Sequence, residues 1–253
     1  MKQNVKLIAP ALCLLAIGCG GNHSASITFP LVRMFDAVDG VPSTAVQFHD
    51  LSANLLATTP QEIPGIANPP PDASFVYSLA AATILDNNGN PLYEGASFQY
   101  AQNSKYTVIA CGGSATLQTI VLTDNEGVGT AGNVAIRFID AAVFASPTLG
   151  VDVYVLPTGT TVIPGGATPA VTGLKYATIP TATNAATTDG NGYLIMPDGG
   201  ATTFSVIFTV AGTQTPLFPA QAITVADAAY YTDVLWDTGI TPAQKATLLA
   251  DKR

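Results

Sequence analysis

The sequence predicts an all-β protein in which one β-sandwich unit occurs twice. Only 10% of the 253 residues are charged, and the apolar residues come in short alternating runs rather than in helical stripes. The segment 136–155 also repeats the pattern of the segment 32–50. Each copy begins with an aliphatic residue, an arginine and two large apolar residues before an aspartate, and a second alternating run follows. Because these runs supply two apolar faces, we expect each copy to close its own sandwich.

Residues 1–18 have the composition of a secretory signal peptide. Lys2 and Lys6 make a basic start, residues 7–17 form an apolar core, and small residues follow. About 11 apolar residues are too few to cross a membrane core that needs roughly 20. We therefore expect this segment to be cleaved rather than to span the membrane.

Cys19 is the predicted lipidation site. The segment 15–19 resembles the lipobox of bacterial lipoproteins, in which the cysteine becomes the acylated first residue of the mature chain, although Ile17 stands where a small residue is usual. Ordinary cleavage that leaves a free Cys19 thiol is the alternative. Gly20 in place of an aspartate favours, by resemblance to enteric lipoproteins, the outer membrane. Residues 19–26 would then form a short flexible tether.

Residues 27–127 are expected to form the first sandwich. A strand that begins at Ile27 ends near Asp36, and strict alternation puts Arg33 and Asp36 on opposite faces, so no ion pair between them is implied. The proline-rich segment 58–72 can donate few ladder hydrogen bonds and is interpreted as a surface loop. Two hairpins are expected, with arms at 75–85 and 92–100 and at 105–111 and 116–123.

Residues 133–239 are expected to form the second sandwich, after a linker of small residues at 127–132. Tyr106 of the first copy corresponds to Tyr231 of the second, so the copies correspond at both ends. The second copy is longer, and we place most of its extra residues in a surface loop between residues 165 and 191.

Residues 240–253 are predicted to form a short C-terminal helix. Thr241 would be its N-cap, Pro242 would occupy the first helical position, and Gln244 would reach back to the cap.

Asp36 and Asp140 are a pair of acidic residues preserved between the copies. Each follows a strand where the chain must turn toward Pro42 or Pro147, so each carboxylate is predicted to cap the turn by accepting backbone N–H groups. An acid/base pair is the alternative, and it would require the two carboxylates to face one another across the domain boundary.

Cys111 is the only cysteine that the folded part retains after Cys13 leaves with the signal and Cys19 takes lipid. It therefore has no partner for an intramolecular disulfide. Its apolar surroundings indicate a buried strand, where a lone cysteine behaves as a small hydrophobe, and no cation lies nearby in sequence to activate the thiol.

Several kinds of chemistry are disfavoured by composition. His23 and His49 are the only histidines, and His23 lies in the tether, which argues against Ser-His-Asp catalysis and multi-histidine zinc sites. A net charge of −8 argues against a nucleic-acid partner. We expect no enzymatic activity, no cofactor and no metal. Paired carboxylates for glycoside hydrolysis are a remote alternative, drawn from Asp36, Asp39, Asp50 and Asp140.

Two further features admit both a binding and a structural interpretation. The loop 86–90 resembles the start of a calcium loop, but Pro91 stands where the EF-hand requires glycine, so a hairpin turn is favoured. Four aromatic residues could form an exposed patch for a glycan or protein, although core packing is favoured. They are Tyr154, Tyr230, Tyr231 and Trp236.

The repeated pattern resembles the bacterial cell-surface family known as domain of unknown function 4397. The resemblance rests on a V-R-x-x-x-A-like strand, a V-D-V-Y-V strand, a Y-T-V-hydrophobic strand and a V-L-T-D-N segment. These lie at residues 136–141, 151–155, 106–110 and 121–125, and the two copies together span about residues 27–239. The resemblance implies an exported immunoglobulin-like sandwich without assigned chemistry. Asp36 and Asp140 stand where the family commonly has histidine.

The sequence thus predicts a lipid-anchored, non-catalytic structural or protein-interaction module of the bacterial cell envelope, periplasmic or surface-exposed. An envelope protein or a glycan would be its partner. The alternative is a ligand- or carbohydrate-binding lipoprotein that captures a small molecule between the domains or on the insertion of the second copy.

Overall fold

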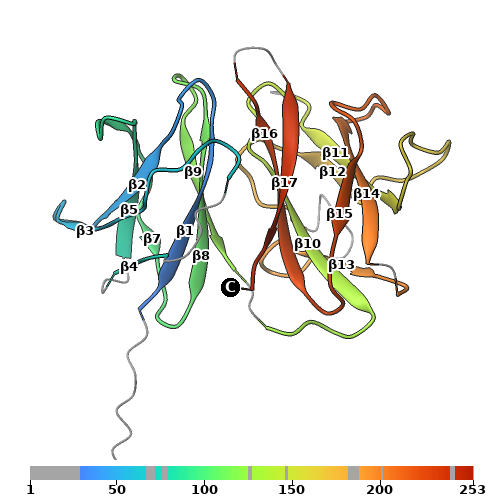
Figure 1. Ribbon diagram of the computed structural model, residues 1–253, viewed down its shortest axis with the longest axis horizontal. Coiled ribbons are helices and arrows are strands. Elements are labelled where there is room, and N and C mark those ends of the chain that lie inside the picture. The colour runs from blue at the N-terminus through green and yellow to red at the C-terminus, as the bar shows by residue number, and fades with distance from the viewer. Residues whose placement is uncertain are drawn as a thin grey trace, which may run out of the picture.

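The computed structural model is all-β, which confirms the predicted class (Figure 1). It describes residues 29–66, 72–75, 79–124, 127–145, 148–181, 188–200, 202–239 and 243–252. These residues contain 17 strands in four sheets and no helix. Each sheet draws its strands from one repeat only, so the strands of the two copies do not intermingle.

The first repeat consists of two facing sheets, with strand orders β4-β1-β8-β9 and β3-β2-β5-β6, and β7 pairs with β5. Their inner faces enclose an apolar core that includes Met34, Phe48 and Val108. The predicted hairpins appear as β5 with β6 and β7, and as β8 with β9. The strands are β1 (Leu31–Val38), β2 (Ala45–His49), β3 (Leu55–Thr58), β4 (Ala73–Ser74), β5 (Leu79–Leu85), β6 (Pro91–Glu94), β7 (Phe98–Gln99), β8 (Lys105–Gly112) and β9 (Gln118–Thr123).

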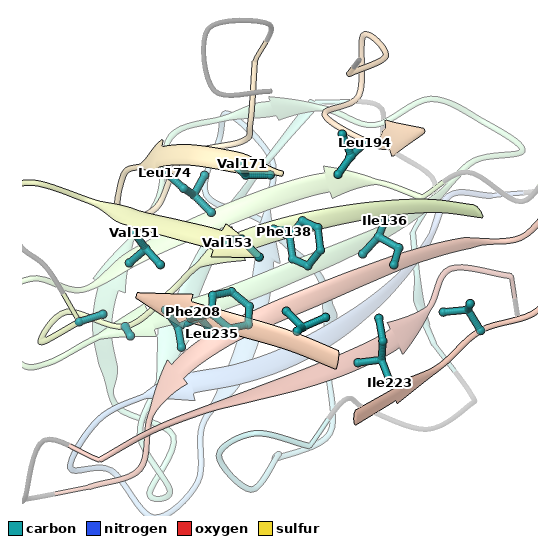
Figure 2. Close-up of a cluster of buried hydrophobic side chains, with 14 of the residues drawn as sticks. Ile136, Phe138, Val151, Val153, Val171, Leu174, Leu194, Phe208, Ile223 and Leu235 are labelled. Atoms are coloured by element: carbon teal, nitrogen blue, oxygen red, sulfur yellow. The ribbon is translucent and has the colours of Figure 1, made fainter. Parts of the chain in front are cut away.

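The second repeat has the same plan, with strand orders β13-β10-β16-β17 and β12-β11-β14-β15. Phe138, Val153 and Phe208 lie in its apolar core (Figure 2). The strands are β10 (Asn133–Asp140), β11 (Val151–Pro157), β12 (Val171–Leu174), β13 (Leu194–Pro197), β14 (Thr203–Val210), β15 (Gln221–Thr224), β16 (Tyr230–Asp237) and β17 (Gln244–Ala250). β12 falls within the expected surface loop 165–191 and forms a strand there because Val171 and Leu174 are fully buried in this core.

The prediction of a C-terminal helix over residues 240–253 is wrong. Gln244–Ala250 forms β17, which pairs antiparallel with all but the first residue of β16. Strand pairing with β16 is favoured over a helix because it satisfies the backbone hydrogen bonds of β17 and buries Leu249. The proposed cap residues, Thr241 and Pro242, lie outside the described residues.

The two sandwiches pack against one another through the sheets that contain β1 and β10 (Figure 1). An apolar cluster from both repeats fills the boundary, and it includes Phe35, Ile109, Ile139 and Val234. The two central sheets are therefore covered on both faces in a stack of four layers. Sheets buried on both faces have near-continuous apolar strands, which explains the loose alternation of β1 and β10 in the sequence.

Candidate functional site

The repeat boundary contains a buried polar group of six residues, which we call the ion cluster. It lies on the boundary face of the two central sheets, with three residues from each repeat. β1 and β8 run parallel and place Arg33 opposite Thr107, and β10 and β16 do the same for Arg137 and Thr232. The remaining members follow β9 and β17. The ion cluster consists of Arg33, Thr107, Asp124, Arg137, Thr232 and Asp251.

Arg33 binds across the boundary to the second repeat. Its Nε donates to the hydroxyl of Thr107 in its own repeat, at 2.7 Å. Its Nη2 donates to Oδ1 of Asp251 at 3.0 Å, and its Nη1 donates to the carbonyl of Ala250 at 2.8 Å. These two hydrogen bonds from the terminal nitrogens Nη1 and Nη2 therefore reach the other repeat.

Arg137 makes the reciprocal contacts. Its Nη2 donates to the hydroxyl of Thr232 at 2.9 Å and to Oδ1 of Asp124 at 3.4 Å, and its Nη1 donates to the carbonyl of Thr123 at 3.0 Å. The guanidinium carbon also lies 4.5 Å from the ring centre of Tyr193. The hydroxyl of Tyr193 in turn bonds Oδ2 of Asp251.

The ion cluster balances two guanidinium groups against two carboxylates, and all four are buried. Buried charges are costly unless they are paired and hydrogen-bonded, and here each arginine reaches a threonine and an aspartate. Charge-assisted hydrogen bonds are stronger than neutral ones and fix geometry. The cluster thus joins the repeats in one register, and its groups are engaged with one another rather than directed at a ligand.

Asp36 and Asp140 each accept backbone hydrogen bonds in the turn that follows their strand. Oδ1 of Asp36 accepts from the amide of Val38 at 2.9 Å and Oδ2 from that of Thr44 at 3.0 Å. Oδ1 of Asp140 accepts from the amide of Ala142 at 3.0 Å, whereas its buried Oδ2 has no partner in the described part of the chain. The two carboxyls thus serve separate turns, one in each repeat.

Burial changes the protonation of these carboxyls. It raises the pKa of Asp36 to about 6, opposed by the hydrogen bonds from Val38 and Thr44. Burial raises the pKa of Asp140 to about 7, opposed by the bond from Ala142 and reinforced by the nearby charge of Asp237. Asp140 has fewer donors, so its charged form is the less stabilised of the two.

The other residues singled out in the sequence are mostly structural. Cys19 and His23 lie outside the described residues. Cys111 is fully buried, and burial raises its pKa to about 12. Asp86 uses its carboxylate to accept the amides of Asn88 and Asn90, as expected of a turn. Among the described residues, no group of three or more His, Cys, Asp or Glu side chains is placed to hold a metal ion.

The four aromatic residues considered for a binding patch do not form one. Tyr154 and Trp236 are buried, the first in a small apolar cluster and the second in the boundary between the repeats. Tyr230 packs edge-to-face on Tyr193, with ring centres 5.1 Å apart. Tyr231 packs against the apolar core of the second repeat, so the packing interpretation holds for all four side chains.

Two clefts lie at the same end of the repeat boundary. One, of about 500 Å³, lies between the β1–β2 turn and the end of the β16–β17 hairpin, and Asp39, Trp236 and Lys245 line it. The other, of about 510 Å³, lies at the equivalent β8–β9 hairpin and is lined by Tyr93, Ala115, Thr116, Leu117, Gln118, Val143 and Tyr176. We call these the charged cleft and the tyrosine cleft. Sequence reasoning identified neither.

The aspartates of the ion cluster were also missed, although the sequence carries a signal for them. Asp124 ends the segment Leu122-Thr123-Asp124, and Asp251 ends the similar segment Leu249-Ala250-Asp251. The repeat therefore continues past the tyrosines to the end of β17, and following it would have paired the two aspartates.

The fold and its boundary define a tandem β-sandwich module whose two units are joined by buried ion pairs. Residues 30–154 match the family model described as domain of unknown function (DUF4397). Residues 30–154 therefore belong to this family. The match covers the whole first repeat and extends through β10 into β11.

Three solved structures are similar to the chain at low identity. The Bacillus anthracis TIE protein is 8% identical with a TM-score of 0.25, and the match covers 86% of this chain and 34% of that one. A "putative cell adhesion protein" from Bacteroides fragilis NCTC 9343 is 10% identical with a TM-score of 0.22, covering 88% and 97%. Another, from Bacteroides eggerthii DSM 20697, is 12% identical with a TM-score of 0.19, covering 91% and 97%. The chain spans about a third of the TIE protein's length. No curated protein matches it.

Proposed function

We propose that the chain is a non-catalytic structural or protein-interaction module of the bacterial cell envelope, held at the membrane by a lipid on Cys19. The observation that carries the proposal is the ion cluster, because its reciprocal Arg33–Asp251 and Arg137–Asp124 pairs join the repeats across a buried boundary. A joint of this kind suits a spacer that presents its loops at fixed positions to a partner.

The anchor is proposed from the sequence. The lipobox-like segment 15–19 leads into the predicted tether 19–26, and Gly20 favours the outer membrane. None of the described segments is a helix long and apolar enough to span a bilayer.

We also propose that the module carries out no reaction. Two of the described carboxyls with raised pKa values, Asp36 at about 6 and Asp140 at about 7, are fully buried and bonded to their own turns. A general acid must reach its substrate within hydrogen-bond distance, and these two carboxyls face the inside of their repeats.

Cell fractionation with intact-mass measurement tests the anchoring directly. We expect the full chain, expressed in a Gram-negative host, to partition with the outer membrane and to carry acyl chains on Cys19. The Cys19→Ser variant should be released in soluble form, while Cys111→Ser, which leaves the lipobox unchanged, should remain bound. An unacylated parent chain, or a Cys19→Ser variant that stays in the membrane, would contradict the proposal.

The tyrosine cleft favours a second candidate, a ligand- or carbohydrate-binding lipoprotein. Tyr93, Tyr176 and Gln118 combine aromatic faces with an amide in one cleft, which is the combination that binds sugar rings. Titration calorimetry with short neutral oligosaccharides tests it. Binding that Tyr93→Ala abolishes would support this candidate, and an absence of heat with every sugar would count against it.

A further inference from the structure

The charged cleft is lined by two opposite charges that have no partner among the described residues. Asp39 comes from the β1–β2 turn of the first repeat, and Lys245 comes from β17 of the second. Oδ1 of Asp39 is a buried oxygen without a hydrogen-bond partner in the described part of the chain. The ammonium group of Lys245 is exposed and forms no ion pair there. Because each repeat supplies one charge, the site is complete only when the repeats are joined.

Asp237 also lines the charged cleft, but its carboxyl is already engaged. Its Oδ1 accepts a hydrogen bond from Nε2 of Gln244 at 2.9 Å, and its Oδ2 accepts one from the amide of Phe144 at 3.1 Å. The lining charges without a partner are therefore Asp39 and Lys245.

Most of the remaining lining of the charged cleft is apolar. It includes the indole of Trp236 and the side chain of Ile63, which is 63% exposed, together with Val41, Pro42 and Pro64. An apolar cleft with a few placed polar groups is the usual form of a small-molecule site, and its volume of about 500 Å³ is of ordinary size for one.

A third cleft, of about 410 Å³, adjoins the charged cleft at Asp39. The two share residues 38–41 as lining. The third cleft is otherwise lined mainly by apolar side chains, among them Leu92, Leu117 and Phe144, and Phe144 is 54% exposed. We call it the phenylalanine cleft. Asp39 thus stands between a cleft that carries a positive charge and a cleft that is mainly apolar.

We propose that these two clefts bind a short peptide with free ends and apolar side chains. The N-terminal ammonium of the peptide gives Asp39 the donor that it lacks, and the C-terminal carboxylate pairs with Lys245. One side chain packs on Trp236, and the other enters the phenylalanine cleft. Charge-assisted hydrogen bonds are roughly twice as strong as neutral ones, so a ligand that carries both charges is favoured over one that carries neither.

The ion cluster supports this site because it holds the repeats in one register. Asp39 and Lys245 are then kept at a fixed separation before the peptide arrives, and such preorganisation lowers the cost of binding. The inference goes beyond the proposed function, since it depends neither on the lipid at Cys19 nor on the tyrosine cleft.

Titration of the purified full chain with the dipeptide dileucine tests the proposal. Trp236 is the single tryptophan of the chain and lines the charged cleft, so its fluorescence reports on binding, and calorimetry gives the affinity. We expect saturable binding of dileucine, weaker binding of leucine, and no binding of dileucine that is acetylated at one end and amidated at the other. Dileucine that fails to bind at millimolar concentration, or a blocked peptide that binds equally well, would overturn the proposal. Leucine that binds as tightly as dileucine would overturn the assignment of a peptide.

Substitutions at the two charges locate the site. Asp39→Asn and Lys245→Met should each lower the affinity for dileucine about tenfold or more, because each removes a charge-assisted hydrogen bond. Both variants should keep the urea midpoint of the parent, since neither side chain has a partner to lose. Lys252→Met, at an exposed lysine outside the clefts, and Tyr93→Ala, in the tyrosine cleft, are the controls and should bind dileucine like the parent. Unchanged affinity in Asp39→Asn and Lys245→Met, or binding that only Tyr93→Ala abolishes, would contradict the assignment.

Discussion

Replacing Arg137 by methionine is expected to lower the free energy of unfolding by about 3 to 5 kcal/mol, the typical cost of removing one partner of a buried ion pair. Arg137 is 1% exposed, and it donates hydrogen bonds to Thr232, to the carbonyl of Thr123 and to Asp124. Methionine keeps most of the apolar stem but leaves the Asp124 carboxylate with Arg33 as its remaining cation in the ion cluster, at 3.9 Å.

Urea denaturation followed by tryptophan fluorescence suits this measurement. Trp236 is the single tryptophan of the chain and lies in the apolar cluster at the boundary, so its emission reports on separation of the repeats as well as on unfolding. Lys245→Met is the matched control, because it removes one positive charge at an exposed position of β17 and should change stability by less than about 0.5 kcal/mol.

A companion variant separates charge balance from packing. Arg137→Met combined with Asp124→Leu removes one complete pair and leaves Arg33 with Asp251 at 3.0 Å. Since replacing a buried pair by apolar residues is often close to neutral, the double variant should recover most of the lost stability. A loss for Arg137→Met no larger than that of the control would refute the account of the ion cluster.

Three further predictions concern the buried carboxyls and the thiol. Because the pKa values of Asp36 and Asp140 are raised to about 6 and 7, their contribution to stability is fully present below about pH 4 and is lost as the pH rises through 6 to 7. The urea midpoint should therefore fall between pH 5 and pH 8, and fall less in Asp140→Asn. Asp140→Ala should lower the free energy of unfolding by about 1 to 3 kcal/mol, because one turn amide loses its acceptor. Asp36→Ala should lower it further, because two amides lose their acceptor. Equal losses for the two variants would argue against the capping role. Cys111, fully buried with its pKa raised to about 12, should react with a thiol reagent only after unfolding, and rapid labelling of the native chain would contradict its burial.

The sequence predicted the elements whose neighbours lie close along the chain. The alternating runs indicated the strands, and the prolines and glycines indicated the turns. The repeat also pointed to Arg33, Arg137, Asp36 and Asp140 as equivalent pairs. These signals are local, because a strand and its following turn are determined by side chains a few positions apart.

The boundary could not be predicted in the same way. Period-2 alternation separates the two faces of a strand but does not show that both faces are buried. The sequence around Arg33 therefore does not indicate that its partner is Asp251, which directly follows β17. The helix predicted at the C-terminus failed for a related reason. The capping pattern at residues 241–244 is a weak local preference, and pairing of β17 with β16 overrides it.

The central claim, that the repeats are joined in one fixed arrangement, is tested most directly by a distance measurement between them. Spin labels on cysteines introduced at Ser52 and Thr161, exposed in the first and second repeat respectively, can be placed in the Cys19→Ser background, where Cys111 is buried. Pulsed electron resonance should give a single narrow distance distribution that Arg137→Met broadens. A broad distribution in the parent chain, of the kind that two domains on a flexible linker give, would contradict the account.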